Sequence, residues 1–106
     1  MYDLKWSAAE KKLARSVFEA ALTAELAETM AEFKAKAAAL AEPQQMWALQ
    51  QYLERKQREI DRKYDFRYSQ LPWVFGELIR QGRIQETELA GLSEEKLDYI
   101  RRSASL

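Results

Sequence analysis

The sequence contains neither cysteine nor histidine, and it has only three glycines and two prolines among its 106 residues. Without cysteine there can be no disulfide, and the usual ligands of zinc, copper, haem and iron–sulfur sites are missing. Catalysis also lacks its commonest general base and its thiol nucleophile. We therefore expect a protein without cofactor or metal that is not an enzyme.

A net charge is lacking too, because seventeen lysines and arginines balance seventeen aspartates and glutamates. A neutral chain creates no overall field that attracts nucleic acid or an anionic membrane. No apolar run approaches the roughly 18 residues of a transmembrane helix, and the N-terminus has no apolar signal-peptide core. These features predict one soluble, cytoplasmic domain over residues 1–106, with neither nucleic acid nor membrane as partner.

Helix-forming residues fill the first two thirds of the chain, where no glycine occurs. Ser7 and Glu10 have the spacing of a capping box, in which each side chain accepts a hydrogen bond from the other residue's backbone N–H. Nothing then interrupts a helix until about Ala41. Its large apolar residues recur about every 3.67 residues, which is the spacing of a nearly straight helix. One small chain cannot cover so long a helix on all sides. We therefore expect part of its apolar surface to contact a second subunit in a homodimer.

A second helix is predicted to begin at Pro43, because proline is favourable in a first turn. It should run to about Phe66 and return antiparallel to the first helix. Glu59 and Lys63 are four residues apart and would form a supporting ion pair on its surface. Residues 8–66 are thus predicted to form a long helical hairpin.

The last third is predicted to form a small helical head over residues 69–103. Ser69 can cap a helix that runs to about Arg80 and stops at Gly82, and Ser93 can cap a last helix. A short turn of helix should connect them. The predicted fold class is therefore all-α: a long antiparallel helical hairpin plus a small C-terminal helical head, in a homodimer.

The charged middle of the chain admits two other functions. Its basic residues could follow a phosphate backbone while Tyr64 and Tyr68 stack on bases, but the interspersed acidic residues would repel phosphates. Asp61 and Asp65 share a helix face and could bind a hard cation, but no glycine-rich ligand loop accompanies them. A solvated helix face is the simpler interpretation.

A run in which charged and aromatic residues alternate dominates this region. It reads Glu59-Ile60-Asp61-x-Lys63-Tyr64-Asp65-x-Arg67-Tyr68-Ser69-x-Leu71, with Trp47-Ala48-Leu49 before it and Val74-Phe75 and Gly82 after it. Glu88-Leu89-x-x-Leu92-Ser93-x-x-Lys96 and Trp6-Ser7 extend the pattern over most of the chain. In these motifs the sequence resembles the fluorescence recovery protein family of cyanobacteria.

The resemblance implies an all-helical homodimer that acts without covalent chemistry. Members of this family bind the photoactivated orange carotenoid protein and accelerate its return from the red, quenching form to the resting orange form. The implied mechanism is preferential binding that lowers the barrier between two states of the partner. The alternative is a divergent homologue that serves as a dimeric helical adaptor for a different partner.

The chain departs from the family pattern on its second predicted helix. Gln50-Gln51 stand where the family pattern has His-Asp, and an arginine of that pattern aligns with Gln57. The loss of these charges removes charge-assisted contacts. We therefore expect the partner-binding surface at Trp47, Gln50, Gln51, Gln57 and Arg58. The residues expected to fix the bend between hairpin and head are Asp61, Tyr64, Asp65 and Arg67.

Overall fold

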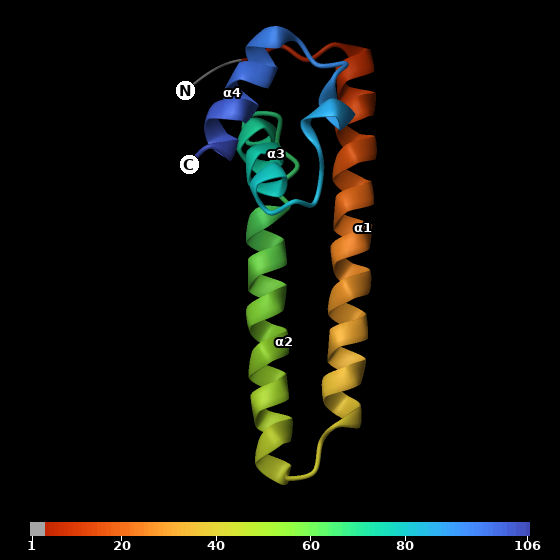
Figure 1. The fold of residues 1–106 in the computed structure, drawn as a ribbon. Coiled ribbons are helices and arrows are strands. Elements are labelled where there is room, and N and C mark those ends of the chain that lie inside the picture. The colour runs from red at the N-terminus through yellow and green to blue at the C-terminus, as the bar shows by residue number, and fades with distance from the viewer. Residues whose placement is uncertain (1–3) are drawn as a thin grey trace. The chain divides into compact units, whose positions relative to one another are not determined.

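The computed structural model describes residues 4–106, and these form four α-helices and one short 3₁₀ helix (Figure 1). In chain order they are α1 (Ala8–Ala38), α2 (Pro43–Lys63), α3 (Leu71–Arg80), η1 (Glu86–Leu89) and α4 (Glu94–Ala104). No residue in the described range lies in a strand. The predicted all-α class is therefore confirmed for the described chain.

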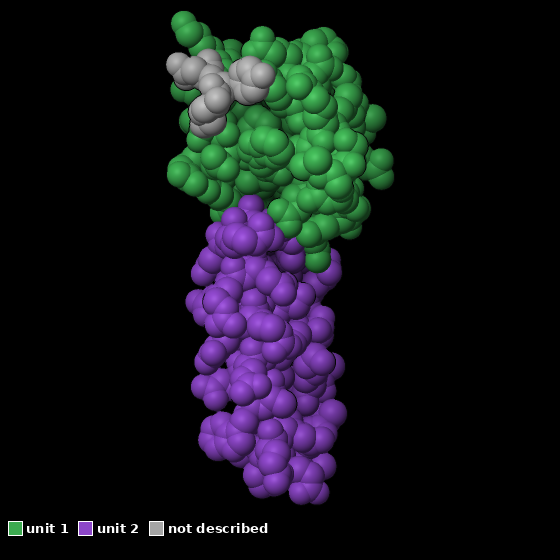
Figure 2. All heavy atoms as spheres, turned by 90° about the vertical axis from the view of Figure 1, so that its left-hand side faces the viewer, with its two compact units in different colours: residues 1–21, 64–106 green, residues 22–63 purple. Residues whose placement is uncertain are grey.

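The chain divides into two units, which Figure 2 colours separately. Unit 1 consists of residues 1–21 and 64–106, and unit 2 consists of residues 22–63. Helix α1 thus contributes its first turns to unit 1 and its remaining turns to unit 2. The sequence indicated a head over residues 69–103, but it did not indicate that the start of the first helix belongs with it.

The capping box predicted at the start of α1 is present. The backbone N–H of Ser7 donates to Oε1 of Glu10 at 3.0 Å, and the N–H of Glu10 donates to Oγ of Ser7 at 3.1 Å. Oε2 of Glu10 also accepts from the N–H of Ser93 at 2.8 Å, and Nζ of Lys96 lies 3.2 Å from Oε1. Desolvation would raise the pKa of Glu10, but two backbone N–H donors and the Lys96 ammonium outweigh it and lower that pKa. Glu10 therefore ties the start of α1 to α4 within unit 1.

Helix α1 ends at Ala38, earlier than the predicted end near Ala41. The side chain of Gln45, at the third position of α2, reaches back over the connection. Its Oε1 accepts hydrogen bonds from the backbone N–H groups of Ala41 at 2.6 Å and Glu42 at 2.9 Å. This is one half of a capping box, and it satisfies N–H groups that would otherwise lack a partner at the helix start.

Helix α2 ends at Lys63 and not near Phe66, and residues 64–67 form no regular secondary structure. The first and third residues of this segment both place their rings against the start of α1. Tyr64 and Phe66 accordingly both contact Phe18, with ring centroids 5.4 and 4.9 Å from it. Tyr68 continues the row at 5.6 Å from Phe66. The aromatic contacts inside unit 1 thus outweigh the local helical preference.

Helix α3 begins at Leu71, and Ser69 does not cap it as predicted. Gln70 occupies the cap position in a helical conformation and makes no side-chain capping hydrogen bond. The N–H groups of Gln70 and Leu71 donate instead to the carbonyl of Arg67 at 2.7 and 3.0 Å. The Arg67 carbonyl of the preceding turn therefore accepts hydrogen bonds at the start of α3, where the serine hydroxyl was expected to do so.

Two other helix boundaries predicted in the last third of the chain are confirmed. The last turn of α3 is followed by Gly82, whose φ of 73° lies in the left-handed region that glycine adopts without strain. Ser93 caps α4, because its Oγ accepts a hydrogen bond from the N–H of Lys96 at 3.4 Å.

Most of the buried hydrophobic residues belong to unit 1. Its fully buried large side chains are Phe75, Leu71, Leu78, Leu89 and Ile100. In unit 2 the later turns of α1 run antiparallel to α2 (Figure 1). Ile60 is the one buried hydrophobic residue among residues 22–63. Unit 2 is therefore poor in core.

Unit 2 buries an ion pair between α1 and α2. Nζ of Lys63 lies 2.7 Å from Oε1 and 2.8 Å from Oε2 of Glu25, and the two side chains are only 5% and 6% exposed. The sequence predicted that Lys63 would pair with Glu59 on the surface. That prediction is wrong, because the end of α2 turns the lysine toward α1, and Glu59 lies 4.0 Å from Lys56 instead.

Candidate functional site

The partner surface predicted from the sequence lies on α2 in unit 2. Successive residues of an α-helix are rotated by about 100°, so the five predicted side chains fall within an arc of roughly 120°. They are Trp47, Gln50, Gln51, Gln57 and Arg58, and all are exposed. Trp47 is the large apolar residue among them, with 62% of its surface accessible. The structure thus brings all five onto one face of the helix.

Gln57 and Arg58, neighbours on α2, have different surroundings. Gln57 lines a groove of about 440 Å³ together with Leu26 and Leu53. The guanidinium of Arg58 lies 4.0 Å from the Glu54 carboxylate, which is the ion pair expected four residues apart on a helix. Gln57 therefore borders an apolar groove, whereas Arg58 faces solvent.

The four residues predicted to fix the bend are divided between the two units. Asp61 is exposed on α2 and lines the groove of unit 2, whereas Tyr64, Asp65 and Arg67 belong to unit 1. Nε and Nη2 of Arg67 donate to the Asp65 carboxylate at 2.9 and 2.6 Å. These hydrogen bonds lower the pKa of Asp65. Asp65 and Arg67 therefore form a local clamp, and Tyr64 packs on Phe18.

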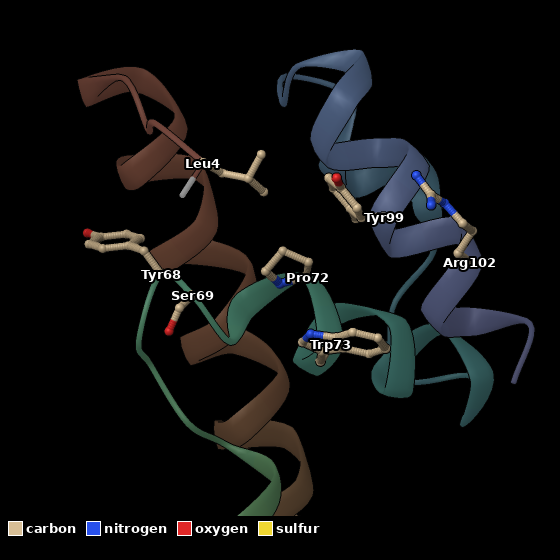
Figure 3. A pocket seen from close by; sticks show the side chains of 7 residues that line it. All are labelled: Leu4, Tyr68, Ser69, Pro72, Trp73, Tyr99 and Arg102. Carbon is tan, nitrogen blue, oxygen red and sulfur yellow. The ribbon is translucent and has the colours of Figure 1, made fainter. Parts of the chain in front are cut away.

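A pocket that the sequence did not reveal opens in unit 1 (Figure 3). It offers about 290 Å³ and is lined by Leu4, Tyr68, Ser69, Pro72, Trp73, Tyr99 and Arg102. Trp73 on α3 is 55% exposed, which is unusual for so large an apolar side chain. We call this the head pocket.

The crossing of α3 and α4 sets the width of the head pocket. The helices meet at Gly76, where a Cβ would lie 2.2 Å from Oγ of Ser103. Oγ of Ser103 donates to the carbonyl of Trp73 at 3.4 Å. Trp73 and Tyr99 each lie one turn before these crossing residues, so the close approach at Gly76 places them on opposite walls of the pocket.

The walls of the head pocket are apolar and its rim carries a cation. The guanidinium carbon of Arg102 lies 4.7 Å from the centre of the Tyr99 ring, a cation–π arrangement. Tryptophan, tyrosine and arginine are the residue types that dominate hot spots of protein interfaces. No local sequence pattern indicates this grouping, because the residues of α3 and α4 come together only in the folded unit.

Residues 6–104 match the model of a family described as "Photoprotection regulator fluorescence recovery protein". The chain belongs to this family. It is 36% identical to the fluorescence recovery protein of Synechocystis sp. over 104 residues, which cover 98% of this chain and 95% of that protein. The family resemblance inferred from the motifs is therefore confirmed.

The fold of this family member is also that of solved fluorescence recovery proteins. The structure from Fremyella diplosiphon gives a TM-score of 0.92 at 34% identity, covering 96% of this chain and all of that one. The structure from Synechocystis sp. PCC 6803 gives 0.91 at 35% identity with the same coverage. The family is one of regulators of photoprotection. Within residues 4–106, no helix combines the length and apolar composition needed to cross a membrane.

Proposed function

We propose that the protein binds the photoactivated form of a carotenoid-binding photoprotection protein, similar to the orange carotenoid protein, and accelerates its return to the inactive orange state. The observation that carries the proposal is the match to the regulator family over residues 6–104. The aromatic residues of the head pocket, with Trp73 exposed and Tyr68 and Tyr99 half-buried, support it, because they are suited to a protein partner.

The mechanism would be differential binding. A protein that binds every state of its partner equally changes neither the populations nor the rate. Acceleration requires tighter binding to the configuration between the red and orange forms than to the red form itself. No bond is made or broken, and no cofactor of this chain takes part.

The experiment that tests this function is a recovery assay in the dark. Orange carotenoid protein from Synechocystis is photoactivated, and the decay of its red absorbance is timed with and without the protein. We expect the decay to become faster in proportion to the amount of protein added, at amounts below that of the carotenoid protein. An unchanged decay rate at equimolar protein would contradict the proposal.

We place the docking site at the head pocket, and a pair of variants tests this placement. Trp73→Ala should raise the protein concentration needed for half-maximal acceleration by roughly thirtyfold, since truncating a hot-spot tryptophan costs about 2 kcal/mol or more of binding free energy. Trp47→Ala is the matched control, because it removes a similarly exposed tryptophan from unit 2. If Trp47→Ala causes the larger loss, the docking site is the face predicted on α2.

A second candidate function, a dimeric adaptor for another partner, is favoured by the three glutamines at positions 50, 51 and 57. They stand where the family pattern has charged or ionisable residues, so charge-assisted contacts of that face are absent. Restoring the residues of the family pattern with Gln50→His, Gln51→Asp and Gln57→Arg distinguishes the two functions. If the triple variant accelerates recovery and the parent does not, the adaptor is the better assignment for this chain.

We also propose that the protein is a homodimer joined through unit 2. Residues 22–63 bury one hydrophobic side chain, Ile60, and leave several large ones exposed. Leu26 and Leu53 line a common groove and are 46% and 42% exposed, and Met30, one turn after Leu26, is 58% exposed. A two-helix hairpin with so little core is marginal alone, and a second copy offers the same apolar face in return.

Leu53→Glu should convert the dimer to a monomer, because it places a charge within the proposed apolar contact. The measurement is the mass by light scattering coupled to gel filtration. Leu106→Glu is the control, since it makes the same chemical change at an exposed leucine of unit 1. A parent protein with the mass of one chain would contradict the homodimer.

A further inference from the structure

The outer face of the first turns of α1 is positively charged. Residues 4–16 contain four cations, Lys5, Lys11, Lys12 and Arg15, and a single carboxylate, Glu10. That carboxylate is turned inward, where it accepts hydrogen bonds from Ser7, Ser93 and Lys96. The face that solvent meets therefore keeps its cations and loses its anion, in a chain whose total charge is zero.

Three of these cations line one surface groove in unit 1. Lys11, Lys12 and Arg15 border a hollow of about 450 Å³ together with Ser16, Glu19 and Tyr68. Arg15 lies 3.2 Å from the Glu19 carboxylate. Within the described residues 4–106, Lys11 and Lys12 have no carboxylate within ion-pair distance. The groove, which we call the basic groove, thus keeps an excess of two positive charges.

Aromatic rings hold two of these cations in place. Nζ of Lys11 lies 5.3 Å from the centre of the Tyr68 ring, and the guanidinium carbon of Arg15 lies 4.1 Å from that of Phe66. A ring attracts a cation without neutralising it. The cations are therefore positioned in advance for an anion, which reduces the entropy that binding loses.

The same contacts decide which anion the groove suits. A nucleic acid would stack its bases on exposed rings. Phe66 is already contacted by Phe18, Tyr68 and Arg15, and the Tyr68 ring lies 5.4 Å from that of Trp6. These rings are committed to the protein itself, so carboxylates fit the groove better than stacked bases.

We propose that the basic groove docks an acidic segment of a partner protein. This surface is additional to the head pocket, with which it shares Tyr68 at one edge. The inference does not depend on the carotenoid protein, because it follows from the cations, the inward turn of Glu10 and the occupied rings.

Fluorescence anisotropy with a labelled oligoglutamate peptide at low ionic strength tests the proposal on the full chain. We expect saturable binding that weakens as salt is added. Lys11→Glu combined with Lys12→Glu should raise the Kd by about fivefold or more, since each exposed ion pair contributes a modest share. Lys34→Glu combined with Arg55→Glu is the matched control, because it makes the same charge change at exposed residues of unit 2. It should change the Kd by less than about twofold.

Three outcomes would overturn the proposal. The first is the absence of saturable peptide binding. The second is equal weakening by both double variants, which would mean general charge attraction and no site. The third is tighter binding of oligothymidylate or of phosphatidylglycerol vesicles than of the peptide, lost in the Lys11/Lys12 variant, which would assign the groove to nucleic acid or membrane.

Discussion

Replacing Lys63 by methionine is expected to lower the free energy of unfolding by about 3–5 kcal/mol, the largest effect of any single substitution considered for this protein. The methionine fits the space of the lysine stem, but it removes the ammonium that pairs with the buried Glu25 carboxylate. A small domain has a total stability of only about 5–15 kcal/mol. The loss should therefore be evident as a shift of the urea midpoint.

Two further variants make this result interpretable. Lys56→Met removes a half-buried lysine of the same helix that lies 4.0 Å from the exposed Glu59 carboxylate, and it should cost about 1 kcal/mol or less. Glu25→Leu combined with Lys63→Met removes both charges and should recover most of the loss. Protein concentration must be constant throughout, because the stability of a dimer depends on it. A Lys63 variant no less stable than the Lys56 variant would refute the buried pair.

Gly76→Ala should destabilise unit 1 by about 1–3 kcal/mol, despite the gain of about 1 kcal/mol that alanine brings to a helix. The added methyl group would lie 2.2 Å from Oγ and 2.4 Å from Cβ of Ser103, so α3 must move away from α4. That movement also widens the head pocket between Trp73 and Tyr99. Thermal unfolding measures the first effect, and the recovery assay measures the second.

Ser103→Gly in the Gly76→Ala background removes the atoms that the new methyl group meets. We expect the double variant to regain part of the stability, though not all, because the backbone nitrogen of Ala104 lies 2.9 Å from the added carbon. Ser103→Gly alone is the necessary control. If the two substitutions destabilise additively, they are not in contact, and the close crossing at Gly76 is wrong.

The course of the chain could be predicted where local chemistry decides it. The absence of glycine before the last third and the proline at position 43 indicated two long helices. Ser7, Ser93 and Gly82 marked three helix boundaries correctly, because caps act within a few residues of the chain. Gln45 was missed because its capping role requires the side chain to reach back over the helix start.

Tertiary contacts explain the remaining differences. Nothing near Lys63 in the sequence shows that it points at Glu25, which is 38 residues away. Tyr64 and Phe66 would continue a helix by local preference, but in the irregular segment after α2 both rings pack on Phe18. The head pocket requires α3 and α4 to meet at a glycine, and one sequence alone does not reveal that meeting.

Unit 1 is built from both ends of the described chain, and this has a consequence for how the protein is made. The hydrogen bond between Ser93 and Glu10 joins residues 83 apart, and Nζ of Lys96 donates to the carbonyl of Lys5 over 91. During translation the start of α1 leaves the ribosome with Val17 and Phe18 uncovered, and their packing partners follow only later. Such transiently exposed apolar surface is where nascent chains aggregate or recruit chaperones. The start of α1 can therefore be fully packed only after α4 has been synthesised.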